Sequence, residues 1–282
     1  NLFEPIWQDV VFPFTFTAMI HNIIKDKATR LFIMLGGFFI ANALIAEFIG
    51  VKIFSLEGTL GIKPIDINLF GNSFSFNLTA GVLLWPVVFI MTDIINEYYG
   101  QKGVKFLSYL TAVLISFAFL MFFWAIRLEP ASWWPGSKVN AGVPDMQVAY
   151  RAVFGQGLWI IIGSLTAFLI GQILDVFVFH KIKQYTGEKK IWLRATGSTL
   201  FSQFIDSFVV LGIAFYIGPM IDPSNGDPWS LQQLLSIGTG NYIYKFVVAL
   251  AMTPVIYLGH NLIEKYVGPE KAEEMKQSAM KR

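Results

Sequence analysis

The chain has 282 residues, of which 55% are hydrophobic and 14% are charged, and its mean hydropathy is +0.56. A soluble globular fold explains this composition poorly, because ordinary soluble domains are far less apolar. The formal net charge of +2 gives no indication of nucleic-acid binding, and no nucleic-acid-binding motif is present. The absence of cysteine excludes disulfides, thiolate metal sites and cysteine nucleophiles.

Residues 1–20 combine aromatic side chains with prolines, as at Trp7, Phe12, Pro13 and Phe14. They lack the basic start and the small-residue cleavage site of a secretory signal. We therefore expect 1–30 to be an interfacial or cytoplasmic segment that precedes the membrane domain.

Six apolar windows follow, each long enough to cross about 30 Å of hydrocarbon as a helix that rises about 1.5 Å per residue. Lipid offers the backbone no hydrogen-bond partners and the sequence shows no barrel-like alternation, so each window is predicted to be helical. The chain is thus predicted to be an all-α integral membrane protein, a bundle of six transmembrane helices. The predicted spans are roughly 31–49, 78–98, 104–126, 157–179, 195–217 and 238–258.

The segments between the spans differ sharply in positive charge. One set of connections, together with the two ends of the chain, carries 15 Lys and Arg residues, whereas the alternate loops carry 5. The positive-inside rule then places both termini in the cytoplasm. We expect a membrane domain over 31–260 and a charged cytoplasmic tail over 261–282.

Several polar residues lie inside the second span, where a charge costs roughly 2.5–3.5 kcal/mol on insertion scales. Asp93, Asn96 and Glu97 share one helical face, because they are spaced i, i+3 and i+4. Two interpretations are open for this face. Asp93 and Glu97 could bind a solute, or they could be interface residues paired with Arg194 or Lys102, with Arg194 as a positive-inside anchor.

The fourth and fifth spans repeat an i, i+3 arrangement of a glutamine and a carboxylate, at Gln172 and Asp175 and again at Gln203 and Asp206. From the topology, Asp93 and Asp175 are ~6–8 Å from the inner ends of their spans and Asp206 is ~16 Å in. Polar groups at several depths are what a solute path through a bundle requires. The glutamines could instead be interhelical hydrogen-bond partners, worth only ~0.6 kcal/mol per pair.

Three further polar residues lie in the first and last spans. Asn42 is expected near the midplane, and Glu47 and Lys245 in the outer third at similar depth. Lys245 could therefore pair with Glu47, or it could extend toward the outer interface. Among the aromatic residues, Trp85 and Tyr242 are the best placed to stack on a ligand.

Motifs of enzymes are missing from the sequence. No paired-histidine motif, P-loop or G-x-S-x-G is present, and the three histidines lie near span ends. We therefore predict a protein that is not an enzyme, with no catalytic residue, no metal and no cofactor.

The polar spans also resemble a known family. The resemblance is carried by the run Trp85-Pro86-Val87-Val88-Phe89-Ile90-Met91-Thr92-Asp93, which is followed by Asn96, Glu97 and Gly100. It is similar to the signature of the queuosine precursor transporters, also called the vitamin uptake transporter family. Further matches in the same order over roughly 31–260 are Asn42, Gly171-Gln172-Ile173-Leu174-Asp175, Ser198-Thr199-Leu200-Phe201 leading to Asp206, and Tyr242 with Lys245-Phe246-Val247. The long start and the outer loops 51–77 and 127–156 depart from the family pattern.

The resemblance implies import of a queuosine precursor, a 7-deazaguanine base such as the 7-cyano or 7-aminomethyl form, for salvage into tRNA. The adjacent N–H donors of such a base suit a carboxylate, and its oxo group suits a Gln or Asn amide. We expect Asp93, Gln172, Asp175 and Asp206 to converge on the base, with Asn42 and Lys245 on the side where it enters. The full set of candidate substrate-binding residues is Asn42, Asp93, Gln172, Asp175, Gln203, Asp206 and Lys245.

The expected location is the cell (inner) membrane, with the lipid bilayer and a small-molecule substrate as partners and no nucleic acid; assembly into a homo-oligomer is left open. Two other functions remain open from the sequence. One is the substrate-binding membrane subunit of an ATP-driven vitamin or nucleobase importer, and the other is a membrane protein that transports nothing.

Overall fold

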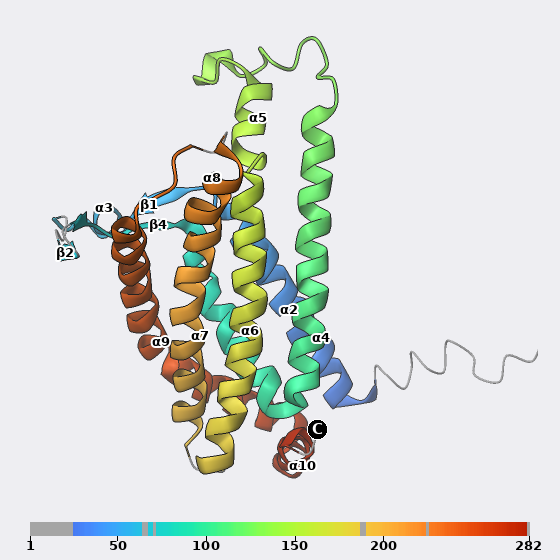
Figure 1. The fold of residues 1–282 in the computed structure, drawn as a ribbon. Coiled ribbons are helices and arrows are strands. Elements are labelled where there is room, and N and C mark those ends of the chain that lie inside the picture. Colours follow the sequence, from blue (N-terminus) through green and yellow to red (C-terminus); the bar gives the residue numbers. More distant parts are fainter. Residues whose placement is uncertain (1–24, 64–66, 70–71, 187–189, 224–225, 281–282) are drawn as a thin grey trace, which may run out of the picture.

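The computed structural model describes residues 25–63, 67–69, 72–186, 190–223 and 226–280. Residues 1–24 of the predicted segment 1–30 lie outside the described part of the chain. Long helices stand side by side in a bundle (Figure 1). The α-helices are α2 (Lys27–Ile49), α3 (Leu56–Leu60), α4 (Trp85–Arg127), α5 (Met146–Phe154), α6 (Leu158–Thr186), α7 (Ile191–Leu211), α8 (Gly218–Ile221), α9 (Leu231–Val267) and α10 (Pro269–Met280).

Five helical segments of the described chain are long and apolar enough to cross a membrane. Together with the composition, they make the protein an all-α, multi-pass membrane protein, as predicted. The segments are Lys27–Ile49, Trp85–Arg127, Met146–Thr186, Trp192–Ile221 and Leu231–Val267.

Helix α4 consists of two arms that meet at Gly100, where the backbone leaves helical geometry (φ 74°, ψ −177°). The chain reverses direction there (Figure 1). Thr92 and Ser108 each lie eight residues from Gly100, and both hydroxyls donate to Gln172 Oε1, at 2.9 and 3.5 Å. In one straight helix these two residues would be about 24 Å apart. The arms 85–99 and 101–127 therefore run side by side. The second arm overlaps the predicted span 104–126, whereas the first arm begins seven residues after the start of the predicted span 78–98.

The reversal at Gly100 requires glycine for two reasons. Its positive φ disfavours a side chain, and a Cβ there would lie 2.9 Å from the backbone oxygen of Ala279 in α10. We expect Gly100→Ala to lower the free energy of unfolding by about 1–3 kcal/mol, measured as thermal unfolding in detergent. Gly37→Ala is the matched control, because Gly37 is helical and has no atom within 4 Å of the added Cβ. Equal melting temperatures for the two variants would contradict the expectation.

Small elements cover one end of the bundle, in the loop predicted as 51–77. Strand β1 (Ile53–Ser55) pairs antiparallel with β4 (Asn77–Thr79), with Ile53 opposite Thr79. Strand β2 (Ile67–Leu69) pairs antiparallel with β3 (Asn72–Phe74). The short 3-10 helix Ala80–Leu83 then leads into α4. Helix α5, beyond the bundle, lies at this same end, and α10 lies at the other (Figure 1).

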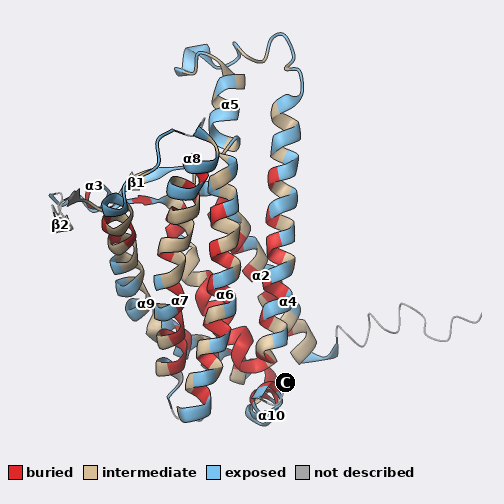
Figure 2. Ribbon diagram, viewed as in Figure 1, coloured by how far each residue is buried: buried red, intermediate tan, exposed pale blue. Residues whose placement is uncertain are grey.

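Buried residues lie mainly on the facing sides of the helices and exposed residues on the outer sides (Figure 2). Phe39 of α2, Ile95 and Ile115 of the two α4 arms, and Phe168 of α6 belong to one buried cluster. Large apolar residues that face outward, such as Phe117, are suited to contact with lipid.

The described part of the charged segment 261–282, residues 261–280, comprises the end of α9 and helix α10. Ala272, Met275 and Ala279 of α10 are buried. Ala272 and Met275 belong to a cluster that includes Ile94 and Tyr98 of the first α4 arm. The segment is thus packed against the bundle near the reversal of α4.

Candidate functional site

A cavity lies between the first arm of α4, helix α7 and helix α9. Trp85, Phe89 and Met252 form part of its apolar wall. An aromatic and apolar wall with a few polar groups is typical of a small-molecule site. The polar lining consists of Asp93, Thr196, Thr199, Gln203, Tyr244 and Lys245.

Two lining side chains have buried polar atoms without a hydrogen-bond partner among the described residues. They are the carboxylate oxygen Oδ1 of Asp93 and the amide nitrogen Nε2 of Gln203. Asp93 is 2% exposed and Gln203 is 3% exposed. Buried polar groups are nearly always hydrogen-bonded, so an acceptor and a donor left open in one cavity indicate a polar ligand.

Asp93 and Asp175 meet at one hydroxyl group. Thr199 Oγ1 of α7 lies 3.5 Å from Asp93 Oδ2 and 3.4 Å from Asp175 Oδ1. Ser202 Oγ of the same helix lies 3.3 Å from Asp175 Oδ1. The three helices α4, α6 and α7 thus bring both predicted carboxylates together. Asp175 is fully buried and, unlike Asp93, is not part of the cavity lining.

Gln172 connects the two α4 arms to α6. Its Oε1 accepts from Thr92 and Ser108, while its Nε2 has no acceptor among the described residues. Because Gln172 does not line the cavity, its contacts favour the interpretation of this residue as an interhelical hydrogen-bond partner.

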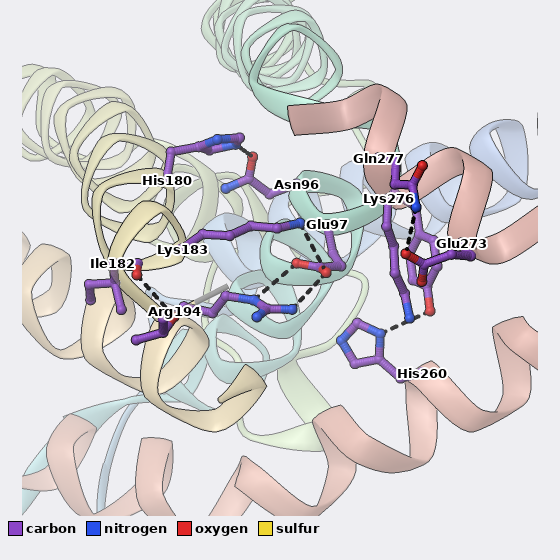
Figure 3. Close-up of polar contacts among 12 residues, drawn as sticks. Asn96, Glu97, His180, Ile182, Lys183, Arg194, His260, Glu273, Lys276 and Gln277 are labelled. Atoms are coloured by element: carbon purple, nitrogen blue, oxygen red, sulfur yellow. Dashed lines mark hydrogen bonds and ion pairs between the residues drawn. The ribbon is translucent and has the colours of Figure 1, made fainter. Parts of the chain in front are cut away.

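One helical turn beyond Asp93, a buried ion cluster joins α4, α6 and α7 (Figure 3). Glu97 accepts from Arg194 Nε at 3.1 Å and Nη2 at 2.7 Å, and Lys183 Nζ lies 3.1 Å from its Oε1. The predicted pairing of Glu97 with Arg194 is confirmed. Lys183 was not predicted as a partner, since its sequence position only marks it as an inner-side charge. Beside the cluster, Asn96 Oδ1 lies 2.8 Å from His180 Nε2.

The predicted pair of Glu47 and Lys245 is wrong. Lys245 forms an ion pair with Asp206, and Glu47 accepts a hydrogen bond from Ser164. The similar predicted depth of Glu47 and Lys245 in the membrane was not enough to make them partners. Helix α9, which carries Lys245, packs mainly against α7, which carries Asp206, and little against α2. Asn42 donates to Phe38 O of its own helix at 2.8 Å and does not line the cavity.

Some lining residues were not identified from the sequence. Thr196, Thr199 and Tyr244 line the cavity, whereas the predicted Tyr242 does not. A usable signal was present, since 195–217 begins with the hydroxyl-rich run Thr196, Ser198, Thr199 and Ser202, unusual for a lipid-facing helix. Of the predicted residues, Asp93, Gln203 and Lys245 line the cavity, as does Trp85.

A bundle of membrane-length helices around a cavity with open polar groups defines a multi-pass membrane protein of the transporter class. Residues 79–259 match the family described as putative vitamin uptake transporter. Because this match covers more than half of the chain, the protein belongs to that family. The resemblance found in the sequence motifs is confirmed.

Three curated relatives are similar to this chain. A probable queuosine precursor transporter from Bacillus subtilis (strain 168) is 32% identical over 192 residues, which cover 67% of this chain and 75% of the relative. The queuosine precursor transporter of Escherichia coli (strain K12) is 26% identical over 185 residues, covering 64% and 72%. A probable queuosine precursor transporter from Haemophilus influenzae (strain ATCC 51907 / DSM 11121 / KW20 / Rd) is 26% identical over 184 residues, covering 64% and 67%. No solved structure matches the chain.

Proposed function

We propose that this protein imports queuosine precursors, 7-deazaguanine bases such as the 7-cyano or 7-aminomethyl form, for salvage into tRNA. The names of the three relatives support this substrate class. The observation that carries the proposal is the open acceptor of Asp93 and the open donor of Gln203 in one cavity. A guanine-type edge presents adjacent N–H donors and an oxo acceptor, which complement these two groups.

The base binds with its polar edge toward Asp93 and Gln203 and its ring face against the wall that contains Trp85 and Phe89. The ion pair of Lys245 with Asp206 borders the cavity on the α9 side. Asp175 and Gln172 act behind the lining, and Asn42 lies on α2, away from it. A base that lacks the matching groups is rejected, because the buried polar atoms of the site would stay unpaired.

The proposed topology has six spans in the cell (inner) membrane and cytoplasmic termini. Each arm of α4 crosses separately; the first arm of 15 residues is about 22 Å long, and Ala80–Leu83 extends it. The reversal at Gly100 and helix α10 then lie on the cytoplasmic side, where most positive residues are found.

The test is ligand binding by the purified chain, followed by uptake. A ligand that binds the folded state raises its stability by about 2.7 kcal/mol at 100 times Kd. We expect 7-cyano- and 7-aminomethyl-7-deazaguanine to raise the melting temperature, and adenine, hypoxanthine and common vitamins to leave it unchanged. A shift with a vitamin and none with a deazaguanine would contradict the proposal.

Uptake of labelled deazaguanine by proteoliposomes that contain only this chain separates the proposal from its alternatives. Transport by the lone chain excludes a subunit that depends on an ATPase. Binding without transport would instead favour such a subunit, and an absence of both would favour a non-transporting protein.

A further inference from the structure

The two buried carboxylates, Asp93 and Asp175, have fewer hydrogen-bond donors than acceptor oxygens. Thr199 has one hydroxyl hydrogen, so it can donate to only one of them at a time. Ser202 Oγ also lies 3.0 Å from Thr199 O, which competes with Asp175 for the hydrogen of Ser202. Asp93 Oδ1 and Asp175 Oδ2 have no donor among the described residues. Ser198 of α7 is a third hydroxyl that interacts with Asp175, but its Oγ also lies 3.1 Å from Ala195 O. The protein thus supplies at most three hydrogens to four carboxylate oxygens.

The pair also lacks a counterion, unlike the carboxylates of Glu97 and Asp206. Glu97 is held by Arg194 and Lys183, and Asp206 is held by Lys245. Within the described part of the chain, no Lys, Arg or His nitrogen lies within 4.0 Å of Asp93 or Asp175. Two unpaired anions at 2% and 0% exposure would be costly, so the site is short of positive charge.

The groups around the pair do not supply that charge. Asp93 lies in the electrostatic field of Asp175, Glu97 and Arg194. Across the cavity, α9 contributes Lys245, which is paired with Asp206 of α7, and the uncharged Tyr244. A hard metal cation takes about six oxygen ligands. No group of three or more metal-binding acidic, histidine or cysteine side chains occurs among the residues described. A proton, by contrast, needs only one open carboxylate oxygen.

We propose that Asp93 and Asp175 bind one coupling proton, so that the protein is a symporter of a proton and a base. The inference rests on the proposed function. A hydronium ion at the outer side transfers its proton to an open carboxylate oxygen, where an O–H bond forms. At the inner side that bond breaks and the proton passes to water. Asp93 lines the cavity and contacts the base. Asp175 lies behind the lining, and the hydroxyl of Thr199 contacts both carboxylates. The proton and the base therefore bind at adjacent sites.

The test uses the full chain in proteoliposomes that contain a pH-sensitive dye, with the membrane potential clamped at zero by potassium and valinomycin. Addition of labelled 7-cyano-7-deazaguanine outside should acidify the interior. With the interior one pH unit more alkaline, the base should accumulate about tenfold, because one proton per base equalises the two gradients. A protonophore should abolish the accumulation, and replacing sodium with choline should change nothing.

Asp175→Asn should bind the base and exchange it across the membrane, but should lose both accumulation and acidification, since an amide takes up no proton. Asp145→Asn is the matched control, with the same chemical change at the N-cap of α5, where asparagine caps as well as aspartate. It should behave as the unmodified chain.

Uptake without acidification, a requirement for a sodium gradient, or full accumulation by Asp175→Asn would overturn the inference and leave the proposed function standing. An absence of deazaguanine binding in the melting assay would instead refute the proposed function. If Asp175→Asn does not fold, the acidification measured with the unmodified chain still decides the question.

Discussion

The Asp93→Asn variant is expected to bind 7-deazaguanine bases about 100-fold more weakly than the unmodified chain, a loss of about 3 kcal/mol. The amide replaces one carboxylate acceptor with an N–H donor, and that donor then faces the N–H groups of the base. A charge-assisted hydrogen bond is lost and a buried donor is left unpaired. Titration calorimetry of the purified variants with 7-cyano-7-deazaguanine measures the effect.

The fold itself should tolerate this change. Asp93 has no ion pair among the described residues, and its one hydrogen-bond contact, to Thr199, is long at 3.5 Å. The melting temperature without ligand should therefore equal or exceed that of the unmodified chain, and Asp145→Asn should retain full affinity. Binding by Asp93→Asn within threefold of normal would show that Asp93 does not contact the base.

Glu97→Gln is expected to lower the free energy of unfolding by about 3–5 kcal/mol, the usual cost of breaking a buried ion pair. Arg194 and Lys183 are 0% and 1% exposed, and both would lose the carboxylate that compensates their charge. Tryptophan fluorescence during thermal unfolding in detergent measures the change. It should appear as a large drop in melting temperature and a reduced yield of folded protein.

Glu264→Gln provides the control for Glu97→Gln. Glu264 pairs with Lys276 at 2.7 Å, but its side chain is 39% exposed, so its loss should cost less than about 1 kcal/mol. A double variant, Glu97→Gln with Arg194→Met, should recover part of the stability, because it removes one of the two buried cations. Equal effects of Glu97→Gln and Glu264→Gln would contradict the role assigned to the ion cluster.

The helical spans were predictable because insertion into lipid depends mainly on the local sequence. Apolar windows of sufficient length predicted the two arms of α4 on either side of Gly100 to within three residues at most ends, but placed the start of the first arm seven residues too early. The strands in the loop 51–77 were not predicted. They are three residues long, and their pairing of Ile53 with Thr79 depends on contacts far apart in the sequence.

The site was predictable only in part. The i, i+4 spacing placed Asp93 and Glu97 on one helical face, yet Asp93 lines the cavity and Glu97 lies in the ion cluster. The two residues lie about one helical turn apart but have different roles. The neighbours of each residue differ because α7 presents Thr199 at one level and Arg194 at another.

Taken alone, the sequence determined the membrane class, the helical windows, the family and the residue types able to bind a polar base. These properties follow from local hydropathy, helical period and motif order. Only the tertiary structure decided which groups meet, as when Lys245 pairs with Asp206 rather than with Glu47. Such pairings depend on how each helix is rotated and which helix lies beside it, and a shift of a few ångströms changes the partner.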